Sequence, residues 1–454
     1  MQSQYNQRFG VVLTALQKMV RRGGTNHIRK IVAKLHPADV AKLLRHFDPD
    51  EQWLIFSVVD DPEFAAGILS ETDGDTSERL IRRTPPPFIA SILRAMSPDD
   101  LTDLLDQLPE DLQQPILSSL HEDLEDVRAL MQYGKDTAGG IMTTDYVALN
   151  ERLSVEEAIK EVRAAGEKVM VSYIYVVDDT DHLRGVVSLR QLILAEPHQT
   201  LRDIMTKEVW KVHVDTDQEE VAHLVAHYNI LAIPVVDKQD VLVGIVTVDD
   251  IIDVIHEEAS EDLAYLSGSS KPLHTLIDAS PVEISKARLP WLGTALLGGL
   301  FSGSIIKYFT GTLAEFISLS IFIPVIMAMG GHHGIQTSTV FIRGLATGEI
   351  RSLLGPLWKE FRVGCIMGAV CGFCLGIAGT LWLGSWMFGV VAGTAMFFAL
   401  NTSAMMGVLL PTFFNRIGVD PAITAGPFIT AIQDVMGLVL YLGLATLLLP
   451  WIPK

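Results

Sequence analysis

The chain has 454 residues, enough for about three domains of typical size, and its acidic residues outnumber the basic ones by 54 to 35. This acidic balance argues against nucleic acid as a partner, because phosphate contacts require a basic surface. Most of the acidic excess precedes Pro290, and Leu, Gly, Ala, Phe, Ile and Met dominate the rest. The composition therefore predicts an acidic soluble half followed by a membrane half.

Residues 1–136 are predicted to form a helical domain. Apolar residues recur at spacings of three and four, and Pro and Asp separate short helices. The segment DVAKLLRHFDPDEQWLIFSVV at 39–59 resembles DLTDLLDQLPEDLQQPILSSL at 100–120. Repeated helix pairs indicate a small superhelix, in which most acidic residues serve as helix N-caps.

The hydrophobic period changes in the next region, where one pattern occurs twice. YIYVVDDTDHLRGVVSLRQLI (173–193) and AIPVVDKQDVLVGIVTVDDII (232–252) each hold two β-branched runs, an acidic turn and a helix. A helix and an IMT triplet precede each copy. This duplication resembles a tandem CBS pair, with copies at 137–200 and 201–260.

CBS pairs often bind adenine nucleotides, and one part of the sequence matches that use. Thr247 and Asp250 fit the hydroxyl-x-x-Asp pattern that holds a ribose, whereas copy one has Ser188 and Gln191. ATP is therefore a possible ligand at Thr247 and Asp250. A capping turn explains the same two residues equally well.

The segment DDIIDVIHEEASED (249–262) is predicted to be a strongly acidic helix. It carries seven acidic residues and neither Lys nor Arg. Like charges four residues apart destabilise an isolated helix, so bound cations or basic partners would favour it. A solvated acidic face is the alternative.

Five apolar segments follow, each long enough to cross about 30 Å of hydrocarbon. They lie at about 289–310, 316–342, 360–383, 386–412 and 424–450. Basic residues at 286–288, 343–362 and 416 predict a cytosolic N-terminal half, a C-terminus outside and a multi-pass protein of the cell (inner or plasma) membrane. We identify no cleavable signal peptide in the first residues, which agrees with this orientation.

Asp434 lies in the middle of the last apolar segment, with no other charged residue in that span. A charge at the bilayer centre costs at least about 2.5–3.5 kcal/mol on insertion scales, so such residues normally face a protein interior or a water path. An ion pathway is the favoured interpretation. A helix–helix hydrogen bond or a protonated acid are the alternatives.

Two further groups of residues accompany Asp434. In PVIMAMGGHHGIQTST (324–339), Pro324 and three glycines are predicted to break or loosen a membrane helix, which is tolerated where protein or water lines it. Asn401 adds a polar group to the fourth segment, with interhelical hydrogen bonding as its alternative role. Asp420 precedes the last segment and either caps its helix or joins the acidic segment 249–262 through a cation.

Together these features resemble the MgtE family of Mg2+ channels and transporters. The resemblance rests on HPADVAKLL (36–44), DTAGGIMTTDYV (136–147), GGHHGIQ (330–336), IRGLATGEI (342–350) and VDPAITAGPFITAIQDVMG (419–437). It implies a multi-domain homodimer that combines all-α and α/β parts: a helical superhelix, a tandem CBS pair, a connecting plug-helix region at 250–285 and a five-helix transmembrane domain at 286–454.

The resemblance also implies site residues. It places Asp434 in a pore at the dimer axis, where it would meet hydrated Mg2+. Further pore-lining candidates are Gly330, Gly331, His332, Gln336, Asn401, Gly426 and Pro427. Cytosolic Mg2+ would close such a pore by bridging acidic residues, and the candidate gating ligands are Asp250, Asp253, Glu258, Glu261, Asp262 and Asp420.

One residue departs from the family pattern and keeps other functions open. His332 stands where Asn is usual, and imidazole suits Co2+, Mn2+, Ni2+ or Zn2+ better than an amide does. A secondary carrier for divalent cations is one alternative, and a membrane-anchored CBS sensor is another. An enzyme is not expected, because the soluble half holds neither a nucleophile–base pair nor a phosphate loop.

Overall fold

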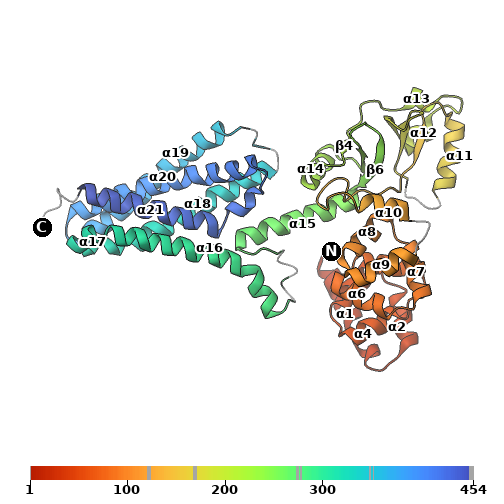
Figure 1. Cartoon of the computed structure of the whole chain (residues 1–454), viewed down its shortest axis with the longest axis horizontal. Helices are drawn as coiled ribbons and strands as arrows, with labels where there is room; N and C mark the ends of the chain where they lie inside the picture. The colour runs from red at the N-terminus through yellow and green to blue at the C-terminus, as the bar shows by residue number, and fades with distance from the viewer. Residues whose placement is uncertain are drawn as a thin grey trace. The chain divides into compact units, whose positions relative to one another are not determined.

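The computed structural model describes residues 2–119, 124–166, 171–271, 276, 279–346, 349–350 and 352–448. The chain divides into two compact units, residues 1–254 and 255–454. The predicted connecting region 250–285 and the predicted last segment 424–450 both extend onto residues outside the described part. Figure 1 shows the elements along the chain.

The first unit begins with a series of mostly short helices, and five of those described start at a proline. They are α1 (Gln2–Val20), α2 (Thr25–Val32), α3 (Pro37–Leu44), α4 (Pro49–Phe56), α5 (Pro62–Ser70), α6 (Gly74–Arg83), α7 (Pro86–Arg94), α8 (Pro98–Gln107), α9 (Glu110–Ser119) and α10 (Leu124–Leu130). Proline suits the first turn of a helix, where its missing N–H has no intrahelical partner. Asp61 and Asp73 accept hydrogen bonds from the next turn, as N-cap residues do.

The helical repeat is confirmed by one hydrogen bond that occurs twice. The side-chain amide of Gln52 donates to the Leu44 carbonyl at 3.1 Å. Gln113, at the equivalent place in the second copy, donates to the Leu105 carbonyl at 2.9 Å. Helices pack on their next-but-one neighbours, α3 on α5, α4 on α6, α5 on α7 and α6 on α8, which produces the predicted superhelix.

Two small sheets follow in the same unit. The first copy contains β1 (Ala148–Asn150), α11 (Val155–Ala165), β2 (Tyr173–Val177), β3 (Leu183–Ser188) and α12 (Leu189–Leu194); the second contains α13 (Leu201–Ile204), β4 (Val212–His213), α14 (Gln218–Tyr228), β5 (Ala232–Val236), β6 (Leu242–Thr247) and α15 (Val248–Ser267). In each copy a parallel pair joins an antiparallel hairpin, in the orders β1-β2-β3 and β4-β5-β6. The CBS pair is confirmed.

The IMT triplets are exchanged between the copies. Thr143, near the start of copy one, pairs with Ile245 in β6 of copy two through backbone bonds of 2.8 and 3.0 Å. Thr206, near the start of copy two, pairs with Val186 in β3 of copy one at 2.9 and 3.0 Å. The sheet of each copy is therefore completed by the first segment of the other copy, which the repeat alone did not indicate.

The second unit holds the predicted five apolar helices. Its elements are α16 (Pro281–Tyr308), α17 (Thr310–Glu315), η2 (Ile317–Phe322), α18 (Ile323–Ala346), α19 (Leu354–Leu383), α20 (Trp386–Arg416), η3 (Pro421–Thr424) and α21 (Pro427–Leu448). The candidate membrane spans are α16, the segment Ile317–Leu345, α19, α20 and α21. Glycines allow α19 and α20 to approach closely, since a Cβ on Gly372 would lie 2.5 Å from the Gly393 carbonyl oxygen.

The predicted helix break in 324–339 is wrong. α18 is one α-helix from Ile323 to Ala346. Pro324 falls in its first turn, where proline is tolerated. The glycines instead admit neighbouring side chains, because a Cβ on Gly331 would lie 3.2 Å from Thr430 and one on Gly334 would lie 3.0 Å from the Ser403 hydroxyl.

Candidate functional site

Asp434 lies in the second turn of α21 and is half-buried within one chain. Its neighbour Gln433 is buried and donates to the Ser403 carbonyl of α20 at 3.4 Å, which fixes the rotation of α21. Within the described part of the chain, the Asp434 carboxylate has no hydrogen-bond or ion-pair partner. A carboxylate on an apolar helix needs such a partner, so water, a cation or another chain must supply it.

The other pore-lining candidates lie in different settings. Gly330 and Gly331 are buried in α18, whereas His332 and Gln336 are exposed. The Nδ1 atom of His332 lies 2.7 Å from the Ala328 carbonyl oxygen, so that ring nitrogen is engaged by its own helix. The adjacent His333 is buried, and neither of its ring nitrogens has a partner of hydrogen-bond geometry among the described residues.

Asn401 is buried between α19 and α20. Its amide donates to the Phe397 carbonyl at 2.9 Å and accepts from the Cys365 thiol at 3.3 Å. A Cβ on Gly364 would lie 3.0 Å from its side-chain oxygen, so α19 closes directly over it. These contacts match the interhelical hydrogen bond that was the alternative to a place on the ion path.

The end of the acidic helix α15 packs against the start of α21 in the second unit. Gly426 has a left-handed φ of +65°, and a Cβ there would lie 2.7 Å from the Leu266 carbonyl oxygen. Pro427 lies 3.0 Å from a Cβ built on Gly268, which follows α15. The candidates Gly426 and Pro427 therefore form the seat of this helix end.

Carboxylates gather beside this seat. Asp420 caps η3 by accepting from the Ala422 N–H at 2.7 Å. Burial, together with the charges of Asp420 and Glu261, raises the pKa of Asp262 to about 6. Glu261 also accepts a 2.6 Å hydrogen bond from the Tyr265 hydroxyl. Glu258 is half-buried on the same helix.

A second acidic cluster lies in the first unit and includes residues of α8 that the sequence did not single out. Burial is the main cause that raises the pKa of Asp250 to about 7, and the negative charges of Asp99, Asp249 and Asp100 raise it further. The hydrogen bond from the Thr247 hydroxyl acts in the opposite direction and lowers this pKa. The pKa of Asp100 is raised to about 6 by burial and Asp99. The Asp99 Oδ1 atom is buried and unpartnered among the described residues. Asp253, which follows Asp250 on the same helix, is exposed.

We predict that the first unit is more stable at low pH when divalent cations are absent. A carboxyl whose pKa is higher in the folded state stabilises the fold below its unfolded pKa, and that contribution is lost as pH rises through about 7 for Asp250. Asp250→Asn should therefore raise the unfolding temperature of the full-length protein at pH 8 by at least about 2 °C, the equivalent of about 1 kcal/mol.

The advantage of the variant should be clearly smaller at pH 5 than at pH 8, because at pH 5 Asp250 is still protonated in the folded protein. Thermal unfolding in chelator, followed at both pH values, is the measurement. Equal unfolding temperatures at pH 8 would contradict the repulsion described for Asp250.

Among the described residues, no group of three or more His, Cys, Asp or Glu side chains is arranged to hold a metal ion within one unit.

Comparison with known proteins gives the family. The pattern described as "Divalent cation transporter", MgtE, matches residues 323–444, and "MgtE intracellular N domain" matches 35–136. The CBS domain pattern matches 138–198 and 201–257. "Magnesium transporter MgtE" of Bacillus subtilis is 33% identical over 97% of this chain and 98% of that protein. The chain belongs to the MgtE family.

Other members agree with this assignment. The Thermus thermophilus "Magnesium transporter MgtE" is 35% identical over 96% of this chain and 98% of its own length. A structure titled "Crystal structure of the cytosolic domain of the Mg2+ channel MgtE in complex with ATP" has 37% identity and a TM-score of 0.50, and covers 53% of this chain and 99% of that one. The MgtE resemblance predicted from the motifs is confirmed.

Proposed function

We propose that this chain is a Mg2+ channel whose pore contains Asp434. The observation that carries the proposal is the half-buried carboxylate of Asp434, which has no partner within the described part of the chain. A hydrated divalent cation is a suitable partner for this carboxylate, whereas the apolar neighbours of Asp434 in α21 are not. Relatives across nearly the full length are named magnesium transporters, which supports Mg2+ as the cargo.

The proposal includes a homodimer with the pore on its axis. Two symmetry-related copies of Asp434 would supply the second carboxylate that one chain lacks. The soluble domains lie in the cytosol and the C-terminus lies outside, as the basic residues beside the spans indicate. Co2+, Mn2+, Ni2+ or Zn2+ would compete with Mg2+ for the pore if they bind the second ring nitrogen of His332.

Cytosolic Mg2+ would close the channel by neutralising the two acidic clusters. In the second unit, Asp262, Glu261 and Asp420 repel one another beside the seat of α15 on Gly426 and Pro427. In the first unit, Asp250 meets Asp99 and Asp100. A cation that binds the closed arrangement more tightly shifts the equilibrium towards it by that difference in affinity. Asp253 and Glu258, on the same helix, would add to the attraction.

We predict that millimolar Mg2+ protects the wild-type cytosolic half against limited proteolysis. In the Asp262→Asn/Asp420→Asn protein the difference between the Mg2+ and chelator digests should shrink, because the repulsion that Mg2+ relieves is already gone. The side-chain amide introduced by Asp420→Asn would still accept the Ala422 N–H through its oxygen, so the η3 cap is kept.

Glu257→Gln is the matched control, since Glu257 is an exposed acid of the same helix. Its digests should respond to Mg2+ as those of the wild type do. A wild-type digest that is identical with Mg2+ and with chelator would rule out this gating mechanism.

A channel is favoured over a carrier because α18 is continuous rather than broken at the glycines. Recordings from the purified protein in bilayers should show unitary currents. Uptake strictly coupled to H+ or Na+ would support the carrier, and loss of uptake in a folded Asp434→Ala protein would eliminate the sensor that does not transport.

A further inference from the structure

The first 47 residues have a charge opposite to that of the rest of the chain. They contain nine Lys and Arg residues and one acidic residue, Asp39, so their net charge is +8. The whole chain has a net charge of −19, which leaves −27 on residues 48–454. Such an asymmetry within one chain indicates a surface that meets an anionic partner.

Most of these cations lie on the exposed side of one helix pair. α1 and α2 pack on each other (Figure 1). Exposed positions of α1 recur every three or four residues and so share one side of the helix. Lys30 and Lys34, four residues apart, are exposed on α2 and the turn after it. We define the basic face as the exposed residues Arg8, Lys18, Arg21, Arg22, Lys30 and Lys34.

A small hollow joins the two helices at one end of the basic face. The residues that line it include Arg8, Lys34, His36 and Asp39. The Lys42 ammonium of α3 lies over the ring of Phe9, another residue of this hollow, 5.4 Å from the ring centre. The hollow has a volume of about 110 Å³, below the roughly 300–1,000 Å³ of typical small-molecule sites. It therefore suits contact with single charged groups at a surface better than capture of a whole small molecule.

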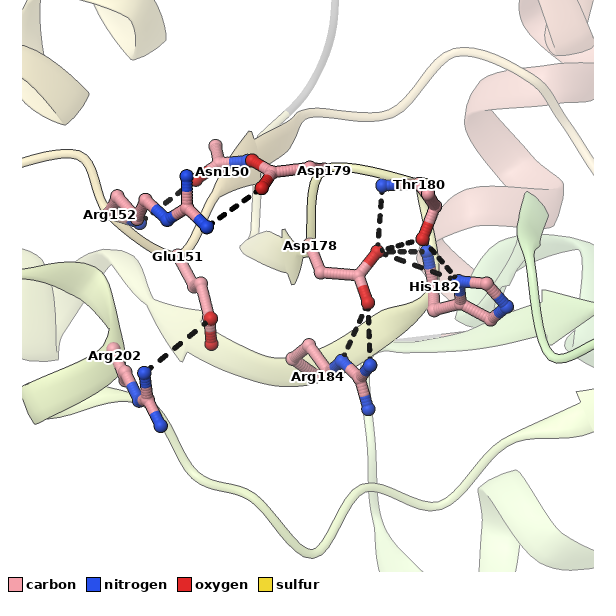
Figure 2. A network of polar contacts seen from close by, with 9 residues as sticks. All are labelled: Asn150, Glu151, Arg152, Asp178, Asp179, Thr180, His182, Arg184 and Arg202. Carbon is pink, nitrogen blue, oxygen red and sulfur yellow. Dashed lines mark hydrogen bonds and ion pairs between the residues drawn. The ribbon is translucent and has the colours of Figure 1, made fainter.

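The cations of the basic face differ from other cations of the first unit because they are not paired. In the first CBS copy, Arg184 donates to Asp178 at 2.9 and 2.6 Å (Figure 2). Arg29 of α2 is paired with Asp60 at 3.3 Å. Within the described part of the chain, none of the six cations of the basic face has an ion pair. Their charge is therefore available to a partner outside the chain.

We propose that the basic face binds the anionic phospholipid headgroups of a membrane surface. Clusters of about four to eight Lys and Arg residues are typical of such surfaces. Val11, which is 70% exposed on α1 between Arg8 and Lys18, adds an apolar side chain that can enter the headgroup region. The chain also carries five candidate membrane spans, so a bilayer is always close to the first unit. The inference depends neither on Asp434 as a pore ligand nor on gating by Mg2+.

Lysine footprinting of the full-length protein tests this proposal. The protein is placed in nanodiscs of phosphatidylglycerol or of phosphatidylcholine, in chelator, and its lysines are methylated with formaldehyde and a reductant. Mass spectrometry then gives the rate at each lysine. Lys18, Lys30 and Lys34 should react at least about threefold more slowly in the anionic discs, because headgroup phosphates bind their ammonium groups. About 0.5 M NaCl should remove this difference by screening.

Lys160 and Lys238 are the controls within each sample. Their side chains are 67% and 78% exposed on the CBS pair, and they should react at the same rate in both kinds of disc.

A charge-reversal variant uses Lys18 as the reporter. In Lys30→Glu/Lys34→Glu, Lys18 should react at nearly equal rates in the two kinds of disc, because most of the attraction to the headgroups is lost. The matched control is Lys160→Glu/Arg163→Glu, which makes the same change of charge at two exposed positions of α11. It should keep the protection of Lys18, since exposed charges elsewhere contribute little.

Three outcomes would overturn the proposal. Lys18, Lys30 and Lys34 could react equally fast in anionic discs, in neutral discs and in detergent. Equal protection in both lipids would instead indicate contact with a second copy of this chain. Protection that arises only after RNA is added would indicate nucleic acid as the partner.

Discussion

Asp434→Asn is expected to reduce Mg2+ uptake at least about tenfold, which corresponds to about 1.4 kcal/mol in the interaction with the ion. The substitution keeps the shape of the side chain and removes only its charge. Because a charged residue is costly inside a membrane, the amide should insert at least as well as the carboxylate does. Uptake of Mg2+ into cells or liposomes that contain equal amounts of each protein is the measurement.

Glu360→Gln is the matched control for this loss. Glu360 is also an acid of an apolar helix, α19, but it already accepts a hydrogen bond from the Thr337 hydroxyl at 3.2 Å. The control should therefore retain much more uptake than Asp434→Asn. If a correctly inserted Asp434→Asn protein took up Mg2+ as fast as the wild type, Asp434 would not be a pore ligand.

The second large effect is expected at Gly426: under the proposed gating mechanism, Gly426→Ala should still take up Mg2+ at cytosolic Mg2+ concentrations that close the wild type. The substitution places a Cβ 2.7 Å from the Leu266 carbonyl oxygen, so the end of α15 must leave its seat. Backbone strain from the left-handed φ adds about 1–2 kcal/mol. Uptake measured over a series of cytosolic Mg2+ concentrations would show the shift.

Gly418→Ala separates the steric effect from the backbone strain. Gly418 has a φ of +74°, close to that of Gly426, but a Cβ there has nothing within 4 Å. Both variants should lose the stability that the strained φ costs, and only Gly426→Ala, which also meets Leu266, should lose Mg2+ control. Equal loss of control in both would mean that the contact with Leu266 is not what keeps the channel shut.

The periodicities that predicted the fold were local ones. Leu-Leu pairs with a following Pro revealed the helical repeat, and β-branched runs around an acidic turn revealed the CBS pair. The exchange of the IMT triplets was not predictable, because a triplet placed before a repeat gives no sign of which sheet it joins. The break predicted in α18 failed because the glycines fit side chains of α20 and α21 rather than a turn.

The candidate sites likewise include residues that the sequence reveals and residues that only the structure reveals. Asp434 stands out in any apolar segment, so sequence sufficed to find it. Asp99 and Asp100 follow Ser97 and Pro98, a typical helix start, and Ser97 does accept from the Asp100 N–H at 3.4 Å. Only the tertiary fold reveals that these capping acids also lie beside Asp250. The sequence does not show which of the adjacent residues His332 and His333 is buried in α18, and the structure places His333 inside.

Because the IMT triplets are exchanged, the two CBS copies are not expected to fold when they are separated. A break between residues 200 and 201 would leave Thr143 on one fragment and its partner strand β6 on the other, and likewise separate Thr206 from β3. Neither fragment would have a complete sheet edge alone, so each would expose an unpaired strand. The two copies are thus a single folding unit. A change that loosens one sheet would also loosen the segment of the other copy that is hydrogen-bonded to it through the backbone.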